Sequence, residues 1–276
     1  MADRIPCVLS IAGSDSGGGA GIQADLKAFA ACGVHGMTAL TAITAQNTVG
    51  VTAVVAVQPE MILAQVRAVA QDIGVDAVKI GMLGDVPTIE TVAAALDELG
   101  GRDRLPVVLD PVMVSESGAR LLDPAARSAL IELLLPRVQV LTPNLPEARA
   151  LASGAGGAGD VSGLEQGDRD DAADLARALH ALGPRVVVVT GGHRNEATDL
   201  FFDGERVVEL GGERFPGEAA HGSGCTHSSV LAARLAWGDS PLTAARIAKR
   251  RAAEAVRDGL VSVGAGSGPV DVLGMT

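Results

Sequence analysis

Short apolar runs alternate with helix-forming segments along most of the chain, and this alternation limits the folds that the chain can adopt. The runs are apolar throughout rather than at every second residue, which is typical of strands covered on both faces. Such alternation predicts a mainly parallel sheet between two layers of helices. Strands are expected at 7–12, 37–45, 77–82, 107–112, 138–142 and 186–190. Helices are expected at 59–73, 88–99, 124–134, 146–152 and 172–182.

The second half of the chain departs from this alternation in three places. Residues 197–215 predict a β-hairpin around Asp203 and Gly204. Residues 153–171 are rich in Gly and Asp and lack periodicity, so they predict a flexible surface insertion. Two long helices are expected to close the chain, at 225–237 and 242–260. With no internal repeat and no clear boundary, the chain is expected to form one α/β domain over residues 1–276.

Composition excludes several classes of partner. The net charge of −11 and the 2% of aromatic residues argue against nucleic acid, whose recognition uses positive charge and stacking rings. An acidic chain can still bind ATP through backbone N–H groups and a metal ion. The three cysteines are too few for a disulfide scaffold, and an odd number is typical of a reducing cytoplasm. Residues 1–10 lack the apolar core of a signal peptide, and no unbroken apolar run reaches about 18 residues, so a cytoplasmic protein without a membrane span is expected.

The first glycine-rich segment, "GSDSGGGAGIQADLKAF", follows an expected strand and leads into a helical pattern. Residues 19–24 formally match the G-x-G-x-x-G/A pattern of dinucleotide-binding loops. That site also needs an acid about 20 residues further on, and no Asp or Glu occurs between Leu26 and Pro59. A Walker A loop is excluded because Gly21 is followed by Ile22 rather than by Lys. From the residues alone, the segment is either a tight turn or a binding loop of another kind.

The second glycine-rich segment, "AAHGSGCTHSSVLAARLAW", predicts an anion site at the start of a helix. Backbone N–H groups and the helix dipole, about half a positive charge, point at such a position. Cys225 is expected in the first turn, where a thiol is acidified and can act as a base or a nucleophile. Alternatively, Cys225 is a small buried apolar residue and the glycines merely turn the chain. A metal cluster of His221, Cys225 and His227 lacks the fourth ligand of a structural zinc site.

Seven segments together resemble a known family. They are "GSDSGGGAGIQADLKAF", "TAITAQNTVGV", "VKIGML", "VVLDPVM", "LTPNLPEA", "VVVVTGGH" and "HGSGCTHSS", in this order. The chain from about Ile5 to Val270 is similar to the hydroxymethylpyrimidine/phosphomethylpyrimidine kinases of thiamin biosynthesis, in the ribokinase superfamily. The resemblance implies a three-layer α/β/α sandwich with a small β-hairpin addition. It also implies a cytoplasmic homodimer that uses ATP and Mg²⁺ to phosphorylate 4-amino-5-hydroxymethyl-2-methylpyrimidine and then its monophosphate.

The resemblance also assigns roles to residues. Cys225 is the expected base, where the sugar kinases of the superfamily carry Asp. The other expected catalytic residues are Gly222, Ser223 and Gly224, which form the anion hole. The expected acceptor site comprises Gln46, Gly13, Ala20, Met82 and Val112. The expected nucleotide site comprises Asn144, Glu147, Thr190, Gly191 and Gly192, and the expected metal ligands are Asp110 and Glu147.

The sequence departs from the family at Thr190, where many members carry Lys, so Lys249 or Arg194 is expected to supply the missing charge. The N–H groups of the first loop are expected to bind the phosphate of the second acceptor. Two alternatives stay open: a pyridoxine/pyridoxal kinase of the same Cys-bearing branch, and a non-catalytic sensor of pyrimidines or nucleotides.

Overall fold

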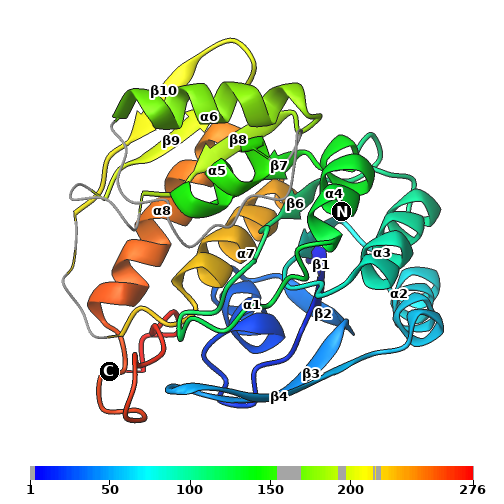
Figure 1. The fold of residues 1–276 in the computed structure, drawn as a ribbon, viewed down its shortest axis with the longest axis horizontal. Coiled ribbons are helices and arrows are strands. Elements are labelled where there is room, and N and C mark those ends of the chain that lie inside the picture. The colour runs from blue at the N-terminus through cyan, green and yellow to red at the C-terminus, as the bar shows by residue number, and fades with distance from the viewer. Residues whose placement is uncertain (1–3, 154–168, 192–196, 214, 216–218, 276) are drawn as a thin grey trace.

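The computed structural model of the chain describes residues 4–153, 169–191, 197–213, 215 and 219–275. Within them, eight strands form one sheet in the order β10-β9-β8-β7-β6-β5-β1-β2 (Figure 1). Strands β2, β1, β5, β6, β7 and β8 are parallel, and β9 and β10 are antiparallel additions. The strands are β1 (Cys7–Ala12), β2 (His35–Leu40), β5 (Ala77–Ile80), β6 (Val107–Leu109), β7 (Val140–Leu141), β8 (Val186–Val189), β9 (Asp199–Phe202) and β10 (Val207–Leu210).

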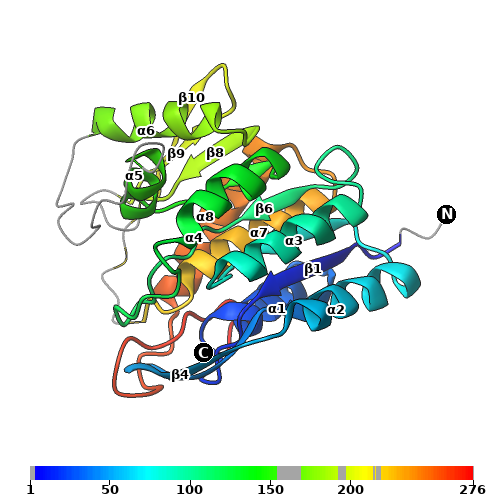
Figure 2. The same cartoon turned by 45° about the vertical axis from the view of Figure 1, so that its right-hand side comes forward.

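Helices cover both faces of this sheet (Figures 1 and 2), which confirms the predicted three-layer α/β architecture. One face carries α2 (Pro59–Asp72), α3 (Val86–Glu98), α4 (Ala126–Ala129), α5 (Leu145–Ser153) and α6 (Arg169–Ala181). The other face carries α1 (Gly21–Ala31), α7 (Ser223–Ala236) and α8 (Pro241–Arg257). Along β1, Leu9 and Ile11 pack into the first layer and Val8 into the second. Two buried faces explain why the strand sequences are apolar throughout.

The predicted strand at 37–45 is wrong as a single element. The chain ends β2 at Leu40 and starts a second, two-stranded sheet of β3 (Ala42–Asn47) and β4 (Gly50–Ala56), seen at the lower edge of Figure 1. Thr41 separates the two sheets: its N–H donates to the carbonyl of Ala12, and its hydroxyl donates to the carbonyl of Met82 at 2.7 Å. Because the segment is β-forming throughout and holds no Gly or Pro near the break, its pattern does not reveal the change of sheet.

Other boundaries differ by a few residues. The predicted helix at 124–134 is a short α4 followed by a π turn, η1 (Leu130–Leu134), and a 3₁₀ turn, η2 (Leu135–Arg137), in which Pro136 has no N–H to continue an α-helix. Strands β5, β6 and β7 end before the predicted 82, 112 and 142. The hairpin at Asp203–Gly204 is confirmed, with Gly204 at φ 93°.

The predicted insertion at 153–171 is helical at both ends, because α5 includes Ser153 and α6 begins at Arg169. Its residues 154–168 lie outside the described part of the chain. None of the described helices is long and apolar enough to cross a lipid bilayer.

Candidate active site

A cavity of about 410 Å³ lies beyond the carboxyl ends of the parallel strands, against the start of α7. This edge of an open α/β sheet is where such folds bind ligands. The predicted site residues that line it are Gly13, Ala20, Gln46, Met82, Asp110, Val112, Asn144, Glu147, Thr190, Gly222, Ser223, Gly224 and Cys225. Gly191 lies beside the cavity rather than in its wall, and Gly192 lies outside the described residues.

The two glycine-rich segments pack backbone against backbone. Gly222 has φ 85°, and a Cβ at this position would lie 1.8 Å from the carbonyl oxygen of Gly19. A Cβ on Gly19 would in turn lie 2.2 Å from the ring of His221. These glycines therefore permit the close approach that brings both segments into one cavity.

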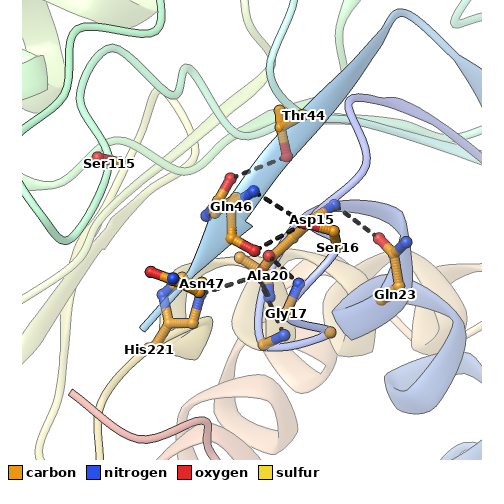
Figure 3. Close-up of polar contacts among 12 residues, drawn as sticks. Asp15, Ser16, Gly17, Ala20, Gln23, Thr44, Gln46, Asn47, Ser115 and His221 are labelled. Carbon is orange, nitrogen blue, oxygen red and sulfur yellow. Dashed lines mark hydrogen bonds and ion pairs between the residues drawn. The ribbon is translucent and has the colours of Figure 1, made fainter. Parts of the chain in front are cut away.

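The Asp15 carboxylate accepts hydrogen bonds from backbone N–H groups of the first glycine-rich loop (Figure 3). Its Oδ1 accepts from Gly17, and its Oδ2 accepts from Gly19 and Ala20, at 2.8, 3.1 and 2.8 Å. The Nε2 of His221 lies 2.9 Å from the same Oδ2. Although burial raises the pKa of Asp15, these hydrogen bonds lower it below its usual value, so the carboxylate is stable. The expectation that these N–H groups bind the second acceptor's phosphate is therefore wrong, because the loop carries its own anion.

Gln46 lies on β3, where a bulge between Ala45 and Gln46 interrupts the pairing with β4. Ser16 fixes its backbone from both sides: the Gln46 N–H donates to Ser16 Oγ at 2.8 Å, and that hydroxyl donates to the Gln46 carbonyl at 2.7 Å (Figure 3). Thr44 donates to its Oε1 at 3.3 Å. The β3–β4 sheet thus places an oriented side-chain amide at the cavity, a context that its sequence neighbours did not indicate.

Met82 forms an apolar part of the cavity wall beside Gly13. A Cβ on Gly13 would lie 2.6 Å from Met82 Cε, so this glycine leaves room for the thioether. Met82 is 9% exposed, which means that it is mostly packed and still reaches the cavity. A flexible thioether provides soft contact with a flat ring.

Cys225 lies in the first turn of α7, but its thiol is not acidified. Burial raises its pKa to about 12, and the negative charges of Asp25 and Asp110 add to this effect. The Lys79 ammonium opposes the rise without cancelling it. The predicted effect of the helix start is thus outweighed by burial, and Cys225 carries its proton at neutral pH.

Asp110 and Glu147 are two buried carboxyl groups: Asp110 directly follows β6, and Glu147 lies in the first turn of α5. Burial and then Asp110 raise the pKa of Glu147 to about 8, and burial also raises the pKa of Asp110. Asn144 and Glu147 form a reciprocal capping box at the start of α5: each side chain accepts from the other's N–H, at 2.8 and 2.9 Å. Both carboxyl groups supply the oxygen ligands that Mg²⁺ prefers. Within the described residues, no three His, Cys, Asp or Glu side chains surround one metal position, so waters and phosphate oxygens would complete a Mg²⁺ shell.

Asp199, in the cavity wall, is the shared partner of Lys249, Gly191 and His227. Its Oδ1 accepts from Lys249 Nζ at 2.7 Å and from the N–H of Gly191 at 2.8 Å. The Nε2 of His227 lies 3.4 Å from its Oδ2. Lys249 thus lies at the cavity wall near Thr190, whereas Arg194, the other predicted cation, lies outside the described residues.

Sequence reasoning missed several of these residues. Asp15 is within the first quoted motif, and His221 and His227 flank Cys225 in the second, so adjacency was a usable signal for these three. Lys79 likewise lies within the quoted segment "VKIGML", whereas Asp199 had no such signal, because its role depends on partners that only the fold brings together.

Comparison with known proteins identifies relatives over nearly the whole chain. A family model described as phosphomethylpyrimidine kinase matches residues 15–271. A hydroxymethylpyrimidine/phosphomethylpyrimidine kinase of Rhizobium meliloti (strain 1021) is 50% identical over 266 residues, which are 95% of each protein. Among solved structures, an ADP complex of Bacillus subtilis pyridoxal kinase is 38% identical with a TM-score of 0.85, covering 97% of both chains. Staphylococcus aureus pyridoxal kinase in complex with AMP-PCP and pyridoxal is 33% identical with a TM-score of 0.85, covering 99% of this chain and 95% of that one.

Proposed function

The chain belongs to the phosphomethylpyrimidine kinase family, and from this premise we propose that it is an ATP-dependent kinase of thiamin biosynthesis. It transfers a phosphoryl group to 4-amino-5-hydroxymethyl-2-methylpyrimidine and then a second one to the monophosphate. The observation that carries the proposal is the single cavity in which an oriented amide, Gln46, and the anion hole of Gly222 to Cys225 meet. The 50% identity to a relative of that name supports the substrate.

The acceptor lies against the first loop. Gln46 offers one donor and one acceptor, which match a ring nitrogen and its neighbouring amino group. Gly13, Ala20, Met82 and Val112 surround the ring with small or soft contacts. Because the N–H groups of the first loop are taken by Asp15, the phosphate of the second acceptor binds at the α7 end of the cavity.

The donor phosphates lie at the start of α7, where the helix dipole and backbone N–H groups favour negative charge. Lys249, held by Asp199, supplies the cation that Thr190 lacks. Asp110 and Glu147 hold Mg²⁺, which when bound neutralises phosphate charge. Phosphoryl transfer passes through a loose transition state, so the protein contributes mainly positioning and charge stabilisation.

Cys225 accepts the hydroxymethyl proton. With a pKa of about 12, roughly one thiol in ten thousand is ionised at pH 8, so the rate follows the small thiolate fraction. The hydroxyl oxygen then bonds to the γ-phosphorus as the bond to the bridging oxygen of ATP breaks, and ADP leaves with that electron pair.

The enzyme is also proposed to work as a cytoplasmic homodimer, as the family resemblance implies. The β3–β4 sheet supports the dimer, because Ile43 and Val55, which pair across the two strands and share one face, are each more than half exposed. A patch of this kind on a soluble protein often marks an interface. Sedimentation of the purified protein is expected to give twice the monomer mass.

The decisive assay supplies ATP with hydroxymethylpyrimidine, its monophosphate or pyridoxal, and compares kcat/KM for the three acceptors. The two pyrimidines are expected to be preferred over pyridoxal by at least about tenfold. A preference for pyridoxal would overturn the assignment in favour of the activity named for the two solved relatives. Ligand binding without turnover would identify a sensor.

A further inference from the structure

A buried ion pair lies directly beneath the cavity. Lys79, on β5, and Asp25, on α1, both have fully buried side chains, and their Nζ and Oδ1 are 2.7 Å apart. Ser229 of α7 donates to the same Oδ1 at 2.7 Å, and Ser10 of β1 donates to Oδ2 at 2.6 Å. Elements β1, α1, β5 and α7 therefore meet on one carboxylate, which holds the ammonium in a fixed position.

Stability alone does not account for this pair. Removing two charges from water is so unfavourable that a well-packed apolar pair is often equally or more stabilising. Lys79 nevertheless stays charged: burial disfavours the ammonium, but the neighbouring negative charges, Asp25 first among them, hold its pKa above the ordinary value. A permanent charge kept at this position calls for a functional reason.

The charge lies at the point where acceptor and donor meet. Lys79 belongs to the wall of the cavity, together with Cys225 and Asp110. Among the described residues, Asp25 is the one hydrogen-bond partner of its Nζ, so one of the three N–H groups is used there. A Cβ on Gly81 would lie 3.0 Å from Nζ, so this glycine leaves no side chain beside the ammonium.

We propose that Lys79 is a positioning residue of the phosphoryl-transfer site: held by Asp25, it is a fixed positive charge behind Cys225. From its fully buried position it stabilises the negative charge on Sγ and on the transferring phosphoryl group. Lys79 keeps its three protons throughout, since the hydroxyl proton goes to Sγ and the electron pair of the broken bond leaves with ADP. The inference rests on the kinase function proposed above.

The test uses two double variants, each of which replaces the Lys79–Asp25 ion pair by an uncharged pair. Lys79→Met with Asp25→Leu makes the site apolar, whereas Lys79→Gln with Asp25→Asn keeps polar partners for Ser10 and Ser229. Both variants are expected to lose about 100-fold in kcat, the loss typical of one preorganised charge-stabilising group, while the KM values for ATP and acceptor stay within about threefold. Ser10→Ala, which keeps both charges, is the matched control and is expected to stay within about threefold of the parent in kcat.

A second readout is independent of the substrate. The rate at which iodoacetamide alkylates Cys225, followed by mass spectrometry of its peptide, reports on the charge behind the sulfur. It is expected to fall in the neutral-pair variants, because Lys79 lowers the pKa of Cys225 by more than Asp25 raises it, and to be unchanged in Ser10→Ala. If a folded neutral-pair variant keeps its kcat and its alkylation rate, the inference is overturned. A parent enzyme that phosphorylates no pyrimidine but shows the alkylation effect would refute the proposed function and leave the charge effect standing.

Discussion

Gly222→Ala tests the contact between the two glycine-rich segments, on which the shared cavity depends. The residue has φ 85°, a left-handed conformation that disfavours an L side chain by about 1–2 kcal/mol. The added Cβ would lie 1.8 Å from the carbonyl oxygen of Gly19, which is backbone that cannot rotate away. Overpacking of this kind costs about 1–3 kcal/mol. The two effects together predict a loss of about 2–5 kcal/mol in the free energy of unfolding, a large part of a typical total of about 5–15 kcal/mol.

Urea unfolding measures this loss, and Gly224→Ala is the matched control. Gly224 lies in the first turn of α7, two residues after Gly222, and the nearest atom to a Cβ there would be Asp110 Oδ2, at 3.9 Å. Alanine at 224 is therefore expected to be neutral or to stabilise the helix by up to about 1 kcal/mol. The midpoint for Gly222→Ala is expected to fall by about 1–2 M urea, given a slope of about 1–3 kcal/mol per M. Equal midpoints for the two variants would refute the role assigned to the backbone contact.

Three further outcomes are expected. The added Cβ of Gly13→Ala would lie 2.6 Å from the flexible end of Met82, so the variant should raise the KM for the acceptor about tenfold. Its kcat at saturating ATP and its free energy of unfolding should change little, and steady-state kinetics and urea unfolding measure these quantities. The logarithm of kcat should rise with pH at a slope near one from pH 7 to 9, because the pKa of Cys225 is raised to about 12; a plateau below pH 8 would exclude the thiolate as base. Mg²⁺ binding at pH 7 should release protons, because Glu147, whose pKa is raised to about 8, is protonated at that pH and Mg²⁺ binds its carboxylate form. Calorimetry in two buffers of different ionisation enthalpy measures the number of protons released, and zero release would contradict Glu147 as a Mg²⁺ ligand.

The layers of the fold were predictable because fully apolar strands and amphipathic helices alternate, and β1 begins and ends at the predicted residues. The turn at Thr41 was not, since its determinants are hydrogen bonds to Ala12 and Met82, which are distant in sequence. Local pattern describes a strand but not the sheet that it joins.

The site shows the same division between local and tertiary signals. The glycine motifs and the Asn144–Glu147 box are local, and the structure contains both. The Lys79–Asp25 pair joins residues 54 positions apart, and nothing near either residue predicts the partner. For Cys225 the local rule even predicts the wrong direction: a helix start lowers the pKa of a thiol, but burial and two carboxylates raise it.

The most direct test of the central claim follows both phosphorylation steps in one reaction. ³¹P NMR of hydroxymethylpyrimidine with ATP, Mg²⁺ and the enzyme is expected to show the monophosphate first and the diphosphate afterwards. Cys225→Ala is expected to slow the first step by at least about 100-fold and the second step much less, because Sγ accepts the hydroxymethyl proton and the phosphate oxygen of the second acceptor carries no such proton. Consumption of ATP without a phosphorylated pyrimidine, or a monophosphate that the enzyme does not convert to the diphosphate, would contradict a single site that transfers both groups.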